Sequence, residues 1–191
     1  KGGKKKGGGG SAAEGGDAES LRAEASKRLE QDVALADQKS GGRGGSNAEF
    51  LKKVVSSGTL TDKMASMMLM VQEAPMHRLR VLDALVKMAE RKGKREQVLA
   101  LETLKDLFVN ALLPPRKLRY FHDLTAAHGG AAAPERSRVL WFFEDALKRR
   151  FAAFVAALES ATHDPLVHVR SKAIRMAFDL LRTVPEQEAA M

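Results

Sequence analysis

Apolar residues recur at steps of three and four along most of the chain from about residue 47, which is the spacing of one face of an α-helix. The clearest case is residues 135–162, where this spacing predicts the longest helix with one continuous apolar face. Trp141 and Phe142 lie off that face and are expected to contact a second neighbour. The apolar face itself consists of Leu140, Phe143, Leu147, Phe151, Phe154 and Leu158.

Helix-ending and helix-starting residues divide the chain into further predicted helices. Gly58 follows the first of them, Thr59 and Asp62 are suited to cap the second, and Gly93 separates the third from the fourth. Residues 114–134, which open on two prolines, are expected to be irregular, with a short turn at 117–121 and a loop at 128–134. The predicted helices are about 48–55, 59–74, 76–92, 94–112, 135–162 and a last one that ends before Pro185.

The last predicted helix has the best-defined start. Asp164 is expected at the N-cap and Pro165 in the first turn, where the missing N–H of proline costs nothing. The string 164–173 matches the second helix of a HEAT-type repeat, in which an Asp before the helix and an Arg inside it, here Arg170, tie adjacent repeats together. Paired helices without any strand pattern predict an all-α, HEAT/armadillo-like α-solenoid, with a compact helical bundle as the alternative.

Residues 1–46 differ in composition from the rest of the chain. They are rich in Gly, Lys and small residues, which bury too little apolar area to offset chain entropy, so this segment is predicted to be disordered, with a weak helical patch around Leu21–Leu35. Its basic start suits a localisation signal, an RNA-contacting tail or a plain linker. The predicted division is therefore 1–46 and a helical-repeat segment 47–188 that continues beyond this chain, which opens on Lys1 rather than Met.

The charge of the chain favours polyanionic partners. The net charge is +8 with a pI near 9.8, which is suited to nucleic acid or to an acidic protein surface. The basic clusters are ordinary solvated faces or one edge of a solenoid near a phosphate backbone, and no aromatic platform interleaved with them is expected. The candidate RNA- or partner-contacting residues are Arg91, Lys92, Lys94, Arg95, Arg116, Lys117, Arg119, Lys148, Arg149 and Arg150.

The sequence contains no recognisable catalytic or cofactor-binding pattern. The chain has no cysteine, which excludes disulfides and thiolate metal sites, and no two of its five histidines stand four residues apart on a helix. Glu144 and Asp145 are better explained by intrahelical charge pairs than by acid–base chemistry. No apolar run approaches the roughly 20 residues that cross a bilayer. We therefore expect no enzyme activity, no cofactor, no small-molecule substrate and no membrane partner.

Three ordered blocks carry a resemblance to a known family. They are 57–64 continuing to 71–77, then 101–108 followed by 112–118, and 164–170 through 185–188. These blocks resemble the CCAAT-binding-factor family of nucleolar-complex proteins, over about residues 47–188. The Gly/Ala insert at 126–134 departs from the tighter pattern of that family.

The resemblance implies a HEAT-like scaffold in the nucleus and nucleolus that acts in assembly of the large (60S) ribosomal subunit. It also implies a second nucleolar-complex protein, early pre-60S particles and precursor rRNA as partners. A transcription cofactor at CCAAT promoters is the alternative that the family name suggests. An importin-like adaptor solenoid is a third, but such adaptors are usually acidic, whereas this chain is basic.

Overall fold

The computed structural model describes residues 11–43 and 45–183, and all regular secondary structure within those ranges is helical. No helix in this part of the chain is both long and apolar enough to cross a membrane. The elements are α1 (Ser11–Arg43), α2 (Gly45–Ser57), α3 (Leu60–Glu73), a 3-10 turn η1 (Pro75–Arg78), α4 (Leu79–Ala89), α5 (Lys94–Leu107), a π-turn η2 (Phe108–Leu112), α6 (Phe121–Ala127), a 3-10 turn η3 (Gly130–Ala132), α7 (Glu135–Thr162) and α8 (Val167–Thr183).

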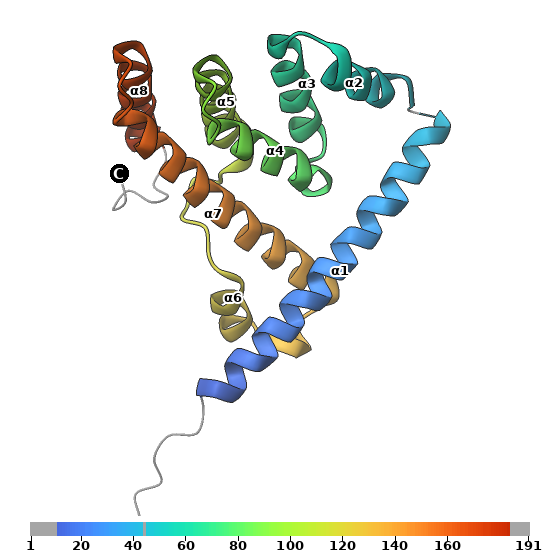
Figure 1. Ribbon diagram of the computed structural model, residues 1–191. Coiled ribbons are helices and arrows are strands. Elements are labelled where there is room, and N and C mark those ends of the chain that lie inside the picture. Colours follow the sequence, from blue (N-terminus) through green and yellow to red (C-terminus); the bar gives the residue numbers. More distant parts are fainter. Residues whose placement is uncertain (1–10, 44, 184–191) are drawn as a thin grey trace, which may run out of the picture.

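The helices form a layered array. Helices α2, α3, α5 and α8 lie side by side along one layer, and α4 and α7 contact each other in a second layer beneath it (Figure 1). Helices α1 and α6 pack on α7, and α1 crosses the picture as a long diagonal whose far end reaches α2. The arrangement is consistent with the predicted all-α solenoid.

The predicted helix boundaries are largely confirmed, and the cap of α3 shows why. Thr59 Oγ1 accepts a hydrogen bond from the amide of Asp62 at 3.3 Å, while the Asp62 carboxylate accepts one from the amide of Thr59 at 3.2 Å. This reciprocal capping box satisfies two amides that the helix leaves unpaired. The segment expected as one irregular stretch at 114–134 contains a short helix, α6, because Phe121 and Leu124 are buried.

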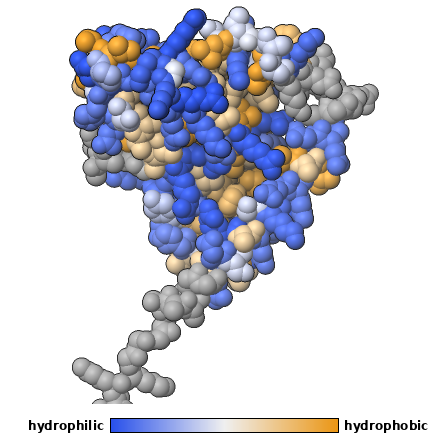
Figure 2. Space-filling model, in the orientation of Figure 1, coloured by the Kyte–Doolittle hydropathy of each residue, from blue (hydrophilic) through white to orange (hydrophobic). Residues whose placement is uncertain are grey.

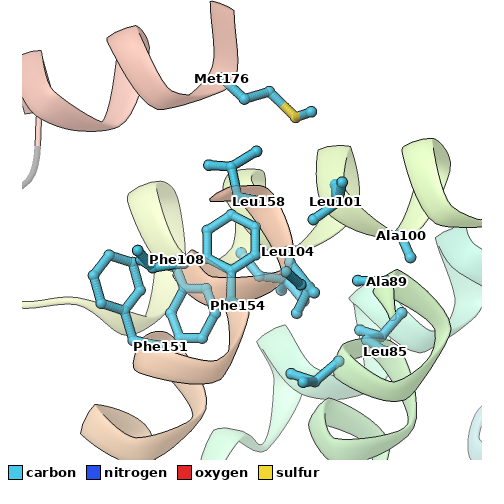
Figure 3. Packing of buried hydrophobic residues seen from close by; sticks show 14 of the residues in the cluster. Leu85, Ala89, Ala100, Leu101, Leu104, Phe108, Phe151, Phe154, Leu158 and Met176 are labelled. Atoms are coloured by element: carbon cyan, nitrogen blue, oxygen red, sulfur yellow. The ribbon is translucent and has the colours of Figure 1, made fainter. Parts of the chain in front are cut away.

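The centre of the core is a cluster of three phenylalanines between α5 and α7. Phe108 lies edge-on to Phe151, with ring centroids 5.0 Å apart, and stacks on Phe154 at 5.5 Å. All three side chains are fully buried, and Leu104 and Leu158 close the cluster (Figure 3). Phe108 begins the π-turn with which α5 ends, before Pro114 and Pro115 prevent helix continuation.

One residue of the predicted apolar face of α7 is placed wrongly. The side chain of Leu140 is 47% exposed, whereas Val139 beside it is buried. The neighbours of α7 change along its length: α4 and α8 cover its later part, and α1 and α6 cover its start. The second neighbour expected for Trp141 and Phe142 is thereby confirmed, since Arg22 of α1 lies 5.4 Å above the Phe142 ring and His128 stacks on Trp141.

The prediction of disorder for residues 1–46 is not confirmed for 11–43, which form α1, the longest helix in the described part of the chain. Residues 1–10 lie outside the described residues. Although α1 has few apolar residues, Leu21, Ala25 and Leu29 recur every fourth position on one side, and Ala25 and Leu29 are buried. Tertiary packing therefore stabilises a helix that low hydropathy alone does not predict.

The start of α8 differs by two residues from the prediction. The first helical hydrogen bond runs from the backbone amide of Arg170 to the carbonyl of Leu166, at 3.1 Å, and not to the carbonyl of Asp164. The Asp164 carboxylate instead closes the preceding turn by accepting the amide of Leu166 at 3.0 Å, and it pairs with Lys94 of α5. The Arg170 guanidinium donates to the backbone carbonyls of Asp164 and Pro165. Arg170 therefore stabilises the backbone of this turn and does not pair with the Asp164 carboxylate.

The contribution of α1 to the fold can be measured with two matched leucines. We expect Leu29→Ala to cost about 2–3 kcal/mol in the docking of α1, because it removes a buried side chain. Leu35→Ala, at a position on the same helix that is 52% exposed, should change little. Hydrogen exchange of the α1 amides is the measurement. Equal protection in both variants would show that α1 does not depend on this packing.

Candidate nucleic-acid interface

The structure brings two of the predicted basic clusters together. The loop that carries Arg116, Lys117 and Arg119 lies against α7, where the Arg116 guanidinium binds both carboxylate oxygens of Glu144, at 2.5 and 3.0 Å. The ammonium group of Lys148 donates to the carbonyl of Leu118 at 2.9 Å. Clusters separated by about thirty residues in the sequence thus form one surface.

Two adjacent carboxylates on α7 hold this surface in place. Asp145 is fully buried and accepts hydrogen bonds from Arg149 at 2.9 Å, from Arg22 of α1 at 3.1 Å and from the amide of Phe121 at 3.4 Å. Burial alone would raise the pKa of Asp145, but these donors outweigh it and hold the pKa below its ordinary value. The same balance lowers the pKa of Glu144, where the donors are Arg116 and the amide of Arg119.

An aromatic pair lies within this basic surface. The ammonium of Lys148 is 4.9 Å and the Arg149 guanidinium 5.9 Å from the centre of the Tyr120 ring, and Tyr120 stacks on His122 with ring centroids 5.6 Å apart. The expectation that no aromatic platform interleaves with the basic clusters is therefore wrong. The signal was in the sequence, since Tyr120 directly follows Arg119. We call the basic platform the set Arg116, Lys117, Arg119, Tyr120, His122, Lys148 and Arg149.

Arg150, predicted with Lys148 and Arg149, faces another way. It pairs with Asp83 of α4 at 2.8 Å and donates to the carbonyl of Ala146, and its side chain is only 20% exposed. Helix geometry explains the separation, because consecutive residues point about 100° apart. Arg150 therefore joins α7 to α4.

The remaining predicted cluster lies at the turn between α4 and α5, next to the start of α8. Two of its four cations are engaged within the fold, since Arg91 pairs with Glu96 at 2.9 Å and Lys94 pairs with Asp164. Lys92 and Arg95 are exposed and form no ion pair with another described residue. The pairing of Arg91 and Lys94 within the fold reduces the charge that this second surface presents to a partner.

An open groove adjoins the basic platform, between α1 and the α6–η3 segment. Its volume is about 730 Å³. His122 stands at the border of the groove and belongs to both features. The other lining residues are Asp17, Ala18, Ser20, Leu21, Thr125, Ala126, Gly130 and Ala131. Within the described residues, no three His, Asp or Glu side chains gather as a metal site would require.

Comparison with known proteins agrees with the resemblance. No protein-family model matches the chain. The chain is 38% identical over 178 residues to CCAAT/enhancer-binding protein zeta of Mus musculus, and this alignment covers 89% of the chain and 17% of that protein. It is 32% identical over 188 residues to Ribosome biogenesis protein NOC1 of Chaetomium thermophilum, covering 89% of this chain and 18% of that protein.

The chain belongs to the CCAAT-binding-factor family of nucleolar-complex proteins. The chain is also 33% identical over 176 residues to Protein SLOW WALKER 2 of Arabidopsis thaliana, and this alignment covers 87% of the chain and 16% of that protein. The chain thus spans about a sixth of the length of each of these relatives.

The buried carboxylate beneath the basic platform gives a pH-dependent prediction. The ion pairs of Asp145 stabilise the fold above its unfolded pKa, near 3.8, and this contribution is lost as the pH falls through the lower folded pKa. We expect Asp145→Asn to cost about 1–3 kcal/mol near neutral pH and progressively less below about pH 4. Urea unfolding from pH 3 to 7 measures the difference.

Glu30→Gln is the control for this series, because that side chain is exposed on α1. Its unfolding free energy should follow that of the unchanged chain at every pH. A deficit in the Asp145 variant that stays constant down to pH 3 would contradict the assignment of the ion pairs.

Proposed function

We propose that this chain is part of a non-catalytic scaffold in the assembly of the large ribosomal subunit, located in the nucleolus. The observation that carries the proposal is the similarity to Ribosome biogenesis protein NOC1, which extends over 89% of the chain. The partners are a second nucleolar-complex protein and the precursor rRNA of pre-60S particles. The chain contributes positioning surfaces and no catalytic group.

The basic platform supports an RNA contact. Its charges come from five cationic side chains, against which stand the carboxylates of Glu144, of the fully buried Asp145, and of Asp123, which lies 3.2 Å from the His122 ring. Arg116 and Arg149 remain more than half exposed although they are paired. Cations that are held in place but still face solvent suit a phosphate backbone, because they need little reorganisation to bind the phosphates and their binding releases the counterions condensed on the RNA.

The pairing of helices supports the HEAT type of array. Helix α4 packs on α5 and α7 packs on α8, and successive pairs meet through the α4–α7 and α5–α8 contacts. The Lys94–Asp164 pair joins α5 to the turn before α8, which is where the HEAT pattern places a link between adjacent repeats. Asp164, Pro165 and Arg170 are the repeat-defining residues in this proposal.

The outer side of α8 supports continuation of the array. One side of this helix is buried against α5 and α7, while another exposes an apolar stripe, and Figure 2 shows an apolar patch over α8 among several on this face. We propose that the next helix of the longer protein covers this stripe, as stacked repeats require. The stripe consists of Val167, Ile174, Phe178 and Leu181.

Sedimentation separates the scaffold from the promoter alternative. The full-length protein should co-sediment with pre-60S particles in a gradient of nucleolar extract, and nuclease treatment of the RNA should release it. Chromatin enrichment at CCAAT promoters, without co-sedimentation, would instead favour the transcription cofactor.

Charge reversal tests the RNA contact of this chain directly. We expect Lys117→Glu with Arg119→Glu to weaken RNA binding and to reduce the slope of log affinity against log salt by about 1 per lost phosphate contact, because fewer counterions are released. Lys53→Glu with Lys87→Glu is the matched control, since both lysines are exposed and lie outside the basic platform. Binding measured by fluorescence anisotropy at several salt concentrations should distinguish the pairs. An equal loss of RNA affinity in both double variants would show that only the net charge of the chain matters and not the position of these cations.

A further inference from the structure

We propose that the basic platform and the adjoining groove together bind an unpaired segment of RNA, with its phosphates on the cations and one base stacked on His122. The inference rests on the proposed function and names the form of RNA and the residue that recognises it. His122 is the decisive residue because it is shared by the platform and the groove.

The stacking geometry leaves a ring surface open. Tyr120 and His122 are close to parallel, with an interplanar angle of 12°, so one face of the imidazole is turned towards the phenol. The His122 side chain is nevertheless 67% exposed. The open part of this ring extends an aromatic stack that Lys148 and Arg149 already flank at Tyr120. A nucleobase added to such a stack contributes about 1–3 kcal/mol.

The groove has the size and chemistry to receive that base. About 730 Å³ lies within the usual range of small-molecule sites, roughly 300–1,000 Å³, so a nucleoside fits. Leu21, Ala18 and Ala126 supply apolar surface for a base plane. Asp17 and Ser20 supply polar atoms for the base edge, and the carboxylate accepts hydrogen bonds from exocyclic amino groups.

The arrangement favours an unpaired strand over a duplex. The bases of a duplex stack on one another and pair through their edges, so a duplex reaches the cations with its phosphates but has no base for His122. An acidic protein segment likewise engages the cations only. Dependence of affinity on His122 therefore distinguishes an unpaired strand from both other partners.

The test uses the whole chain, a 12-nucleotide oligouridine and a 12-base-pair RNA duplex, with affinities measured by fluorescence anisotropy. We expect His122→Ala to weaken oligouridine binding about 5- to 100-fold, the equivalent of one lost stacking contact, and to leave duplex binding unchanged. His122→Phe should restore oligouridine binding, because it returns the ring. His128→Ala is the matched control, since His128 also stacks on an aromatic ring but belongs to neither feature.

A spectroscopic readout is independent of affinity. Tyr120 is the only tyrosine and Trp141 the only tryptophan of the chain, so in a Trp141→Phe background the emission reports on Tyr120 alone. Saturating oligouridine should quench this emission, and the quenching should decrease when His122→Ala is added. Saturating duplex should quench it less. Circular dichroism of each variant confirms that the helix content is unchanged.

Three results would overturn the inference. The first is oligouridine affinity that does not respond to His122→Ala. The second is an equal loss for oligouridine and duplex, which would make the effect electrostatic. The third is a polyglutamate peptide that binds as tightly as oligouridine and displaces it, which would identify the platform as a site for acidic protein. None of these results bears on co-sedimentation with pre-60S particles, so the failure of this inference and of the scaffold proposal are separable.

Discussion

The arrangement of α1, α6 and α7 depends on the hydrogen bonds that the buried carboxylate of Asp145 accepts. Removing a charged carboxylate from water costs several kcal/mol unless donors replace the lost hydration. Here each donor comes from a different element: Arg22 from α1, the amide of Phe121 from α6 and Arg149 from α7 itself. The fold therefore offsets the burial of Asp145 only when all three elements are in place. The loop of the basic platform, which leads into α6, is positioned by the same requirement.

Sequence periodicity predicted the helices of the central array because their cores follow local spacing. Phe151, Phe154 and Leu158 are buried as their steps of three and four require. The failures share one cause, which is contact between residues distant in the chain. Arg22 and Asp145 are 123 positions apart, and no local pattern indicates their pairing. The intrahelical charge pair expected at Asp145 does form, with Arg149, but it is one donor among three.

The sequence indicates which cationic residues form the candidate site, but not how the fold arranges them. Composition identified the cations, yet it could not separate those that stabilise the fold from those that face solvent. Arg150 and Lys94 hold helices together through Asp83 and Asp164, whereas Lys117 and Arg119 stay on the surface. The sequence places Tyr120 directly after Arg119, but it does not indicate the contacts of Tyr120 with Lys148 and Arg149, because α7 supplies these side chains from a distant part of the chain. Net charge thus overstates what is available to a polyanion.

Helix α1 also has a mechanical consequence. It contains 33 residues, which corresponds to about 50 Å of continuous helix. It is fastened to Asp145 of α7 through Arg22, about a third of the way along the helix, and to Arg78 of the turn between α3 and α4 through Asp37, nearer its C-terminal end. Stacked repeats bend by accumulating small rotations between neighbours, and such bending changes the distance between those two attachment points. A helix does not stretch to follow it. This stretch of the array therefore resists flexing, and the surfaces it carries keep a constant spacing.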